Sequence, residues 1–235
     1  MQHLVARLAL LDGFAFWLND RQVIMPFRSQ RVLAFLALHE HPVKRTYVAG
    51  TLWGDNTEQR SAANLRTALA RLPREAGRLV QVIGHQLSLP EWVCVDLRET
   101  SELTRRIIDR DDRVVRVKGI HRRLMVDLLP DWYDEWALSE RERYRELRLH
   151  ALEVMCDALA TAGDFAAAIE AGLAAVAGEP LRESAQRALI RTYLAEGNQA
   201  AAVRQYRRFR LLLDRELGLA PSPSLTALVP LSAAR

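Results

Sequence analysis

Residues 58–74 read Glu-Gln-Arg-Ser-Ala-Ala-Asn-Leu-Arg-Thr-Ala-Leu-Ala-Arg-Leu-Pro-Arg, and their spacing predicts a helix with two distinct faces. Apolar residues recur at intervals of three and four, as in the buried stripe of an amphipathic helix. That stripe consists of Ala62, Leu65, Ala68, Leu69 and Leu72. The opposite stripe has hydrogen-bond donors and positive charge but no carboxylate, and it consists of Arg60, Asn64, Thr67, Arg71 and Arg74.

The polar stripe has the residue types that recognise nucleic acid. Arginine pairs bidentately with guanine and asparagine with adenine, and both reach phosphates. A helix with an apolar back and this front can enter the major groove of DNA. The same pattern also fits an ordinary amphipathic helix with a solvated face, which is the commoner case for such a stretch taken alone. The surrounding sequence decides between these two readings.

The positive charge of the chain is concentrated around this helix. The 235 residues have a formal net charge of +4, and residues 1–95 hold 11 Lys and Arg against 7 Asp and Glu, so the remainder is neutral. A phosphate-binding surface requires clustered positive charge. No apolar run approaches the ~18 residues of a membrane helix, and no signal-peptide pattern precedes the first strand. We therefore expect a cytoplasmic protein, nucleoid-associated when bound to DNA, with no membrane partner.

Residues 1–95 alternate short apolar runs with turn signals and helical periods, which predicts a mixed α+β domain. The expected elements are strands at 4–11, 14–18 and 23–25, a helix N-capped by Ser29, helices at 45–53 and 58–74, and a hairpin of 79–83 with 87–89. Two helices joined by a short turn form a helix-turn-helix, and the following hairpin is then its wing. The order predicts a winged helix-turn-helix.

Three blocks in this region look like the DNA-binding domain of SARP-type antibiotic regulatory activators. They are Leu52-Trp53-Gly54, Ala63-Asn64-Leu65-Arg66-Thr67-Ala68-Leu69-Ala70-Arg71-Leu72 and Val95-Asp96-Leu97-Arg98. The resemblance implies an OmpR-like winged helix whose third helix reads the major groove. Base reading then falls to Arg60, Asn64, Thr67 and Arg71. Phosphate and backbone contacts are expected from Lys44, Arg45, Arg66, Arg74, His85 and Gln86.

Two departures from the family pattern narrow this expectation. Family wings often carry a Gly-Tyr-Arg type of sequence, whereas this chain has Gly84-His85-Gln86-Leu87 and no arginine at the tip. Pro73 stands where another arginine is common, and proline shortens a helix. Base reading should therefore depend on the third helix, with little help from the wing.

Residues 96–235 predict an all-α domain with an internal repeat. Helices are expected at 96–109, 120–129 and 139–160, with a charged turn at 110–113 and a connection at 90–95. Gly163-Asp164-Phe165-Ala166-Ala167-Ala168-Ile169 matches Gly197-Asn198-Gln199-Ala200-Ala201-Ala202-Val203. The offset of 34 residues equals the period of a tetratricopeptide (TPR) helix pair, which favours a TPR-like domain. Two repeats also fit an ordinary helical bundle.

This half resembles the bacterial transcriptional activation domain of the same regulators. The match lies in Leu129-Pro130-Asp131-Trp132-Tyr133-Asp134-Glu135-Trp136, in residues 140–149 and in Glu216-Leu217-Gly218-Leu219-Ala220-Pro221-Ser222-Pro223. The chain has no Gly-x-x-x-x-Gly-Lys-Ser/Thr loop, so we expect a minimal member without a nucleotide-binding module.

Other chemistry-bearing residues favour structural roles. His39 and His41 lack a matching ligand cluster, so no metal is expected. Acidic residues at 131–135 fit a helix start better than an acid–base pair, and the aromatic residues beside them fit a core better than a binding platform. Cys94 and Cys156 are expected to be buried, reduced and not catalytic. An arginine run at 204–210 fits a solvated face.

We therefore expect a sequence-specific transcriptional activator that binds promoter repeats in double-stranded DNA, with no catalytic residues and no cofactor. The resemblance implies that the helical domain contacts RNA polymerase and mediates self-association, with a homodimer possible on DNA. The alternative is a protein–protein adaptor in which the winged helix does not bind DNA.

Overall fold

The computed structural model describes residues 5–73, 79–115, 117 and 119–229. The chain forms two compact units, and it crosses between them more than once. The first unit comprises residues 1–99 and 127–143, and the second comprises residues 100–126 and 144–235. Helices α4 (Asp96–Ile108) and α7 (Glu135–Thr161) each contribute residues to both units.

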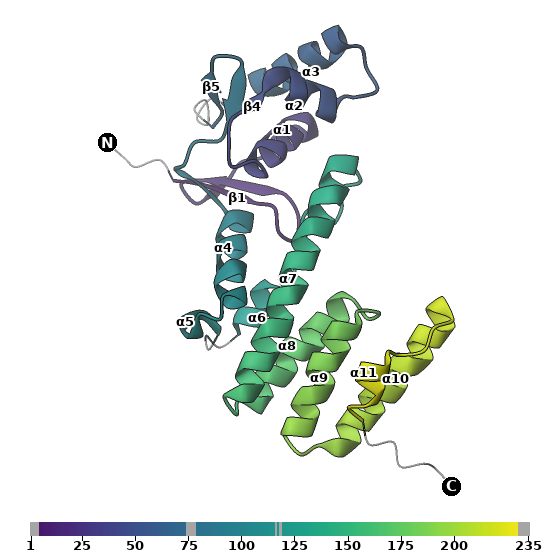
Figure 1. The fold of residues 1–235 in the computed structure, drawn as a ribbon. Helices are drawn as coiled ribbons and strands as arrows, with labels where there is room; N and C mark the ends of the chain where they lie inside the picture. The colour runs from purple at the N-terminus through teal and green to yellow at the C-terminus, as the bar shows by residue number, and fades with distance from the viewer. Residues whose placement is uncertain (1–4, 74–78, 116, 118, 230–235) are drawn as a thin grey trace. The chain divides into compact units, whose positions relative to one another are not determined.

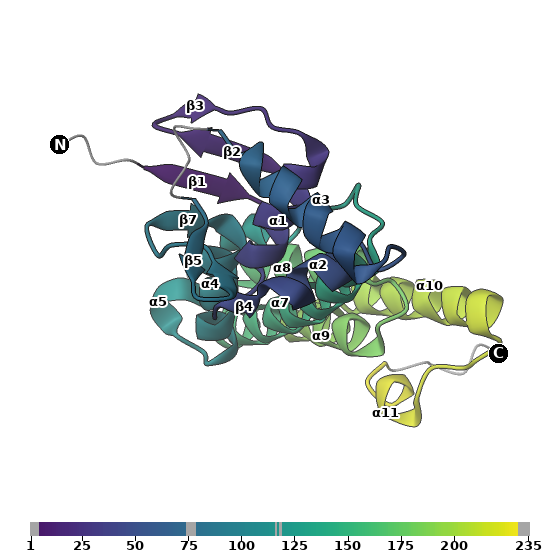
Figure 2. The same cartoon turned by 90° about the horizontal axis from the view of Figure 1, so that it is seen from above.

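A four-stranded sheet forms one layer of the first unit (Figure 2). Its strands lie in the order β3-β2-β1-β7, with β7 parallel to β1 and the other neighbours antiparallel. The strands are β1 (Ala6–Ala9), β2 (Ala15–Leu18), β3 (Arg21–Gln22) and β7 (Val93–Val95). The expected connection at 90–95 thus contains a strand. The third strand lies at 21–22 instead of 23–25, because pairing resumes directly after the turn at Asn19 and Asp20, both of which have positive φ.

Three helices pack in the first unit (Figure 1). They are α1 (Phe27–Ala37), α2 (Arg45–Leu52) and α3 (Glu58–Ala70). The expected N-cap at Ser29 is wrong, since Pro26 occupies that position. Ser29 is instead buried inside α1, where its hydroxyl donates to the carbonyl oxygen of Ala68 at 2.8 Å. This hydrogen bond joins α1 to the back of α3.

A second, three-stranded sheet has the order β4-β6-β5 and includes the predicted hairpin, which follows α3 in the sequence. The hairpin consists of β5 (Gln81–Ile83) and β6 (Gln86–Ser88), and Gly84 turns between them with φ of 59°. A short strand that precedes α2, β4 (Val43–Lys44), pairs with β6 and was not predicted. This pairing brings the tip of the hairpin to the start of α2.

Residues 127–143 complete the first unit after the chain has left it. Leu129 donates its backbone N–H to Leu10, and Asp12 donates to Asp127, so the returning segment joins the end of β1. Trp132 stacks on Phe14 with ring centroids 5.9 Å apart. The predicted core role of the aromatic side chains in this segment is confirmed for Trp132, which is 6% exposed, and is wrong for Tyr133, which is 81% exposed.

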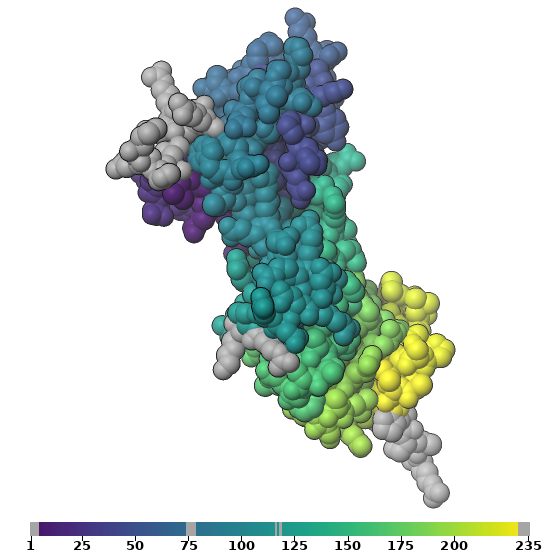
Figure 3. All heavy atoms as spheres, turned by 60° about the vertical axis from the view of Figure 1, so that its left-hand side comes forward, coloured from purple at the N-terminus to yellow at the C-terminus, as the bar shows by residue number. Residues whose placement is uncertain are grey.

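The second unit is helical. Its further helices are α5 (Asp112–Val115), α6 (Ile120–Arg123), α8 (Phe165–Gly178), α9 (Glu183–Ala195), α10 (Gln199–Leu217) and α11 (Pro223–Thr226). The predicted helix at 120–129 is wrong beyond residue 123, and part of the expected charged turn at 110–113 is helical. Helices α9 and α10 pack side by side and are green to yellow in Figure 3.

The matched segments 34 residues apart have equivalent local structure. Asp164 caps α8 by accepting the N–H of Ala167 at 3.2 Å, and Asn198 caps α10 by accepting that of Ala201 at the same distance. The glycine that precedes each cap has positive φ, a conformation that side-chain-bearing residues rarely adopt. The repeat in the sequence therefore encodes two similar helix starts.

The two cysteines differ, which corrects the expectation that both are buried. Cys94 is exposed, because its neighbours on β7 face the core and side chains alternate along a strand. Cys156 is fully buried, and burial raises the pKa of its thiol to about 11.

These environments predict one fast-reacting thiol in the native protein. Since the thiolate is the nucleophile, Cys156 should resist a thiol-specific dye at pH 8 while Cys94 reacts. Mass spectrometry of the labelled protein should find one adduct in buffer and two in denaturant. Labelling of Cys156 at the same rate as Cys94 in buffer would contradict this assignment.

Candidate nucleic-acid interface

Helix α3 has a buried back and an exposed front, as its sequence predicts, but the buried stripe is narrower than expected. Leu65 and Ala68 are buried, together with Ser61, whose hydroxyl donates to the carbonyl oxygen of Trp53 at 2.8 Å. Ala62, Leu69 and Leu72 are only half-buried. The back of α3 is thus centred on Ser61, Leu65 and Ala68, where α1 packs through Ser29.

The four predicted base-reading residues lie on one side of α3 and are not equally accessible. Arg60, Thr67 and Arg71 are exposed, whereas Asn64 is half-buried. Neither of the two arginines has an ion pair within the part of the chain that the structure describes. Thr67 donates its hydroxyl proton to the carbonyl oxygen of Ala63 at 3.0 Å, so this hydroxyl can only accept from a ligand. Two unpaired guanidinium groups therefore dominate this side of α3.

A second cationic group forms where the hairpin meets α2. Lys44 on β4 pairs in register with Gln86 on β6, and the backbone N–H of Arg45 donates to the carbonyl oxygen of His85 at 2.9 Å. Lys44 and His85 are exposed, while Arg45 and Gln86 are half-buried. Pairing of β4 with β6 thus joins four of the six predicted backbone-contact residues.

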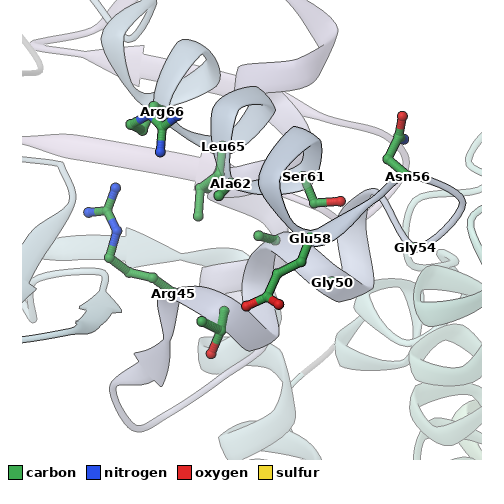
Figure 4. A pocket seen from close by; sticks show the side chains of 11 residues that line it. Arg45, Gly50, Gly54, Asn56, Glu58, Ser61, Ala62, Leu65 and Arg66 are labelled. Atoms are coloured by element: carbon green, nitrogen blue, oxygen red, sulfur yellow. The ribbon is translucent and has the colours of Figure 1, made fainter.

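The remaining two residues of that set are placed differently. Arg66 is exposed on the flank of α3 that faces α2, and it lines a pocket there together with Arg45 (Figure 4). Arg74 lies outside the described residues. Arg66 therefore belongs with Arg45 on one flank of α3, while the base-reading set occupies the other.

The sequence prediction missed Gln59, which lies on the exposed surface of α3 between its two flanks. Helical spacing places Gln59, Ala63 and Ala70 opposite the buried back, and it places Arg66 between them and the flank that faces α2. Gln59 is exposed and carries both a donor and an acceptor. Gln59 could have been found from the sequence by taking the face of the helix opposite the buried residues. The prediction instead selected hydrogen-bond donors that recur at helical spacing.

Within the described residues there is no cluster of three or more His, Cys, Asp and Glu side chains that suits a metal. No helix in the same part of the chain is both long enough and apolar enough to cross a membrane. The exposed cationic and amide side chains of this region are those of Lys44, Gln59, Arg60, Arg66 and Arg71, which bind by hydrogen bonding and charge.

Comparison with known proteins identifies the helical region first. Residues 125–230 match the bacterial transcriptional activator domain family. The regulatory protein AfsR of Streptomyces griseus is 30% identical over 240 residues, covering 94% of this chain, and that of Streptomyces coelicolor is 29% identical over the same share. The helical region thus matches a transcriptional activator domain, and the whole chain is similar to SARP-type regulators. The chain spans 24% of the length of each of these two relatives.

A solved structure has the same fold as this chain. It is described as Mycobacterium tuberculosis EmbR in complex with low affinity phosphopeptide, and it matches with a TM-score of 0.78 at 21% sequence identity. The match covers 96% of this chain and 64% of that one. A mixed α/β N-terminal region followed by a helical region is thereby confirmed. The family is one of transcription regulators and not of enzymes.

Proposed function

We propose that the first unit is an OmpR-like winged helix that binds promoter DNA, with α3 in the major groove and β5–β6 as the wing. The observation that carries this proposal is the exposed arginine side of α3, where Arg60 and Arg71 have no ion pair within the described residues, on a helix whose buried back is anchored to α1 through Ser29. Positioned arginines on an anchored helix are the means by which this class of domain reads base edges.

The two predicted groups then have different tasks. Arg60, Asn64, Thr67 and Arg71 read bases, while Lys44, Arg45, Arg66, Arg74, His85 and Gln86 contact the backbone and fix the register of the helix on the duplex. Since Asn64 is half-buried, the arginines supply most of the discrimination and Asn64 contributes at the edge of the contact.

The helical region recruits RNA polymerase in this proposal, with its repeated helix pairs forming a TPR-like scaffold. We retain the division into residues 1–95 and 96–235 for these two tasks, with residues 127–143 packed on the DNA-binding unit. Self-association on promoter repeats belongs to the same proposal. Activation would then consist of recruitment, because no step of it requires chemistry by the chain.

Substitutions on α3 test the proposal. Arg71→Ala or Asn64→Ala should weaken binding to the target and relax specificity at one base position, by roughly 1–3 kcal/mol for a lost bidentate pair. Fluorescence anisotropy with target and scrambled duplexes measures both effects. The matched control is Arg204→Ala, because Arg204 is an exposed arginine on α10. This substitution should leave both affinities unchanged. Unaltered target and scrambled binding in both α3 variants would exclude α3 as the recognition helix.

One observation favours a second candidate, a protein-binding adaptor. The hairpin exposes Val82 and Ile83, which are 60% and 52% exposed, and it has no arginine at its tip. Salt dependence separates the two functions, since neutralised phosphates make affinity fall steeply with salt concentration. Absence of binding to any duplex at low salt would favour the adaptor.

A further inference from the structure

A cavity of about 520 Å³ lies between α2 and α3, and of the residues that line it only Arg45 and Arg66 are among the proposed DNA contacts (Figure 4). Pockets that hold small organic molecules typically span ~300–1,000 Å³, with mostly apolar walls and a few placed polar groups. This cavity has the size and the composition of such a site.

The cavity exists because the residues on the facing surfaces of the two helices are small and leave the space between them unfilled. Ala49 and Gly50 come from α2, while Ala62 comes from α3, and Leu65 closes the floor. A Cβ atom built on Gly50 would meet no other atom within 4 Å. The sequence thus leaves open a space between two packed helices, and the walls of that space are largely apolar.

Two guanidinium groups line the same cavity. Arg45 comes from the first turn of α2, and Arg66 comes from the middle of α3. In the view of Figure 4 both lie on the left of the pocket and Asn56 lies on the right, with Glu58 between them. Within the described residues neither arginine has an ion pair. Guanidinium groups bind carboxylate and phosphate oxygens through paired, charge-assisted hydrogen bonds.

We propose that this cavity binds a small amphipathic organic anion. Its apolar body would lie against Ala49, Ala62 and Leu65, and its acid group would pair with Arg45 and Arg66. The charged side chains that line the cavity are Arg45, Arg66 and Glu58, with a net charge of 2 − 1 = +1, so the site favours an anion over a cation of the same shape. Inorganic anions should bind more weakly, because they have no apolar part to bury against the apolar walls.

The ligand and DNA compete for the same two guanidinium groups. This consequence rests on the proposed function, in which Arg45 and Arg66 contact phosphates. A bound anion would satisfy both side chains and add negative charge where the DNA backbone approaches. The regulator would then release its promoter as the ligand accumulates, without any rearrangement of the fold.

Three ten-carbon probes test the cavity on the full chain without DNA: decanoate, decylamine and decanol below their micelle concentrations. Isothermal titration calorimetry should detect decanoate, no decylamine, and decanol only weakly. Arg45→Ala and Arg66→Ala should each lower decanoate affinity by about tenfold or more, as expected for a lost charge-assisted hydrogen bond. Ala62→Leu should abolish binding by filling the cavity while keeping both arginines, and Thr46→Leu provides a second filling variant.

Competition is measured by anisotropy of a labelled target duplex. With decanoate at ten times its dissociation constant, simple competition raises the apparent Kd for DNA about elevenfold. Ala62→Leu should bind DNA normally and lose this response, since Ala62 is not among the proposed DNA contacts. The same shift in wild type and Ala62→Leu would contradict competition at this site.

The outcomes separate this inference from the proposed function. DNA binding without any decanoate binding overturns the cavity assignment and leaves the winged-helix proposal intact. Arginine-dependent decanoate binding in a chain that binds no duplex supports the cavity and refutes the DNA-binding proposal. Equal binding of decylamine identifies detergent-like adsorption and overturns the inference. Binding of an acidic, apolar peptide in place of decanoate would assign the cavity to a protein partner and refute the small-molecule proposal.

Discussion

Replacing Trp132 by alanine should destabilise the first unit by about 3–5 kcal/mol, as for other large aromatic side chains removed from a core. Trp132 stacks on Phe14 and meets Phe27 and Trp136 edge-on, with ring centroids 5.1–5.9 Å apart. The loss would leave a cavity lined by three aromatic rings. Because most domains are stable by only ~5–15 kcal/mol, such a loss would raise the fraction of unfolded protein.

Tryptophan fluorescence during urea denaturation measures this effect selectively. All five tryptophans of the chain lie within residues 1–99 and 127–143, so their emission reports on the first unit, and four remain in the variant. The matched control is Tyr133→Ala, since Tyr133 is the next residue and is 81% exposed. Its change should stay within about 0.5 kcal/mol. Equal loss of unfolding free energy in Trp132→Ala and Tyr133→Ala would show that packing of the Trp132 ring does not stabilise the first unit.

Removing the guanidinium of Arg31 should cost about 3 kcal/mol, the lower end for breaking a buried ion pair, because both partners retain some exposure. Arg31 on α1 pairs with Asp134 beside α7, and their side chains are 16% and 19% exposed. The same guanidinium donates to the carbonyl oxygen of Leu52 at 2.7 Å, where α2 ends. Arg31→Met would thus leave the Asp134 carboxylate without its ion-pair partner. It would also remove the hydrogen bond that holds the end of α2, where the turn to α3 begins.

A double substitution distinguishes the pair from its individual side chains. Arg31→Met with Asp134→Leu removes both charges, and replacing a whole buried pair by apolar groups is often neutral. We therefore expect the double variant to be more stable than Arg31→Met alone, with the two transitions compared by tryptophan fluorescence. A double variant that shows the simple sum of the two single losses would mean that the two charges do not interact.

The elements with strong local signals were predictable from the sequence. Helix α3 has its apolar residues at helical spacing over 13 residues, and the hairpin has a glycine at its turn. The matched segments at 163 and 197 predicted the starts of α8 and α10, because glycine and an Asx cap act locally. Periodicity, caps and turn chemistry depend on near neighbours only, which is why reading along the chain finds them.

Features that depend on distant partners were missed. Strand β7 has three residues, too few for a period, and exists because β1 offers it a parallel edge more than 80 residues earlier in the chain. Strand β4 has two residues and depends on β6 in the same way. Ser29 fits the local rule for an N-cap, yet its hydroxyl is used by Ala68 on another helix. The residues alone do not reveal such pairings.

In the candidate interface too, features set by local spacing were predictable and features set by distant partners were not. Exposure of Arg60 and Arg71 follows from helical spacing, and the structure agrees. The partial burial of Asn64 and the meeting of Lys44 with Gln86 depend on how α3 and β6 pack. The cavity between α2 and α3 requires two helices to face each other through small residues, which no single stretch specifies.

The return of residues 127–143 to the first unit has a consequence for synthesis. The ribosome completes the first 99 residues well before it supplies the segment that covers Phe14 and Phe27, since 44 further residues separate Glu99 from Arg143. At about 5–20 residues per second this delay lasts roughly 2–9 s. During that interval Phe14 and Phe27 lack the ring that packs on them, and transiently exposed apolar surface of this kind is what makes a nascent chain depend on chaperones.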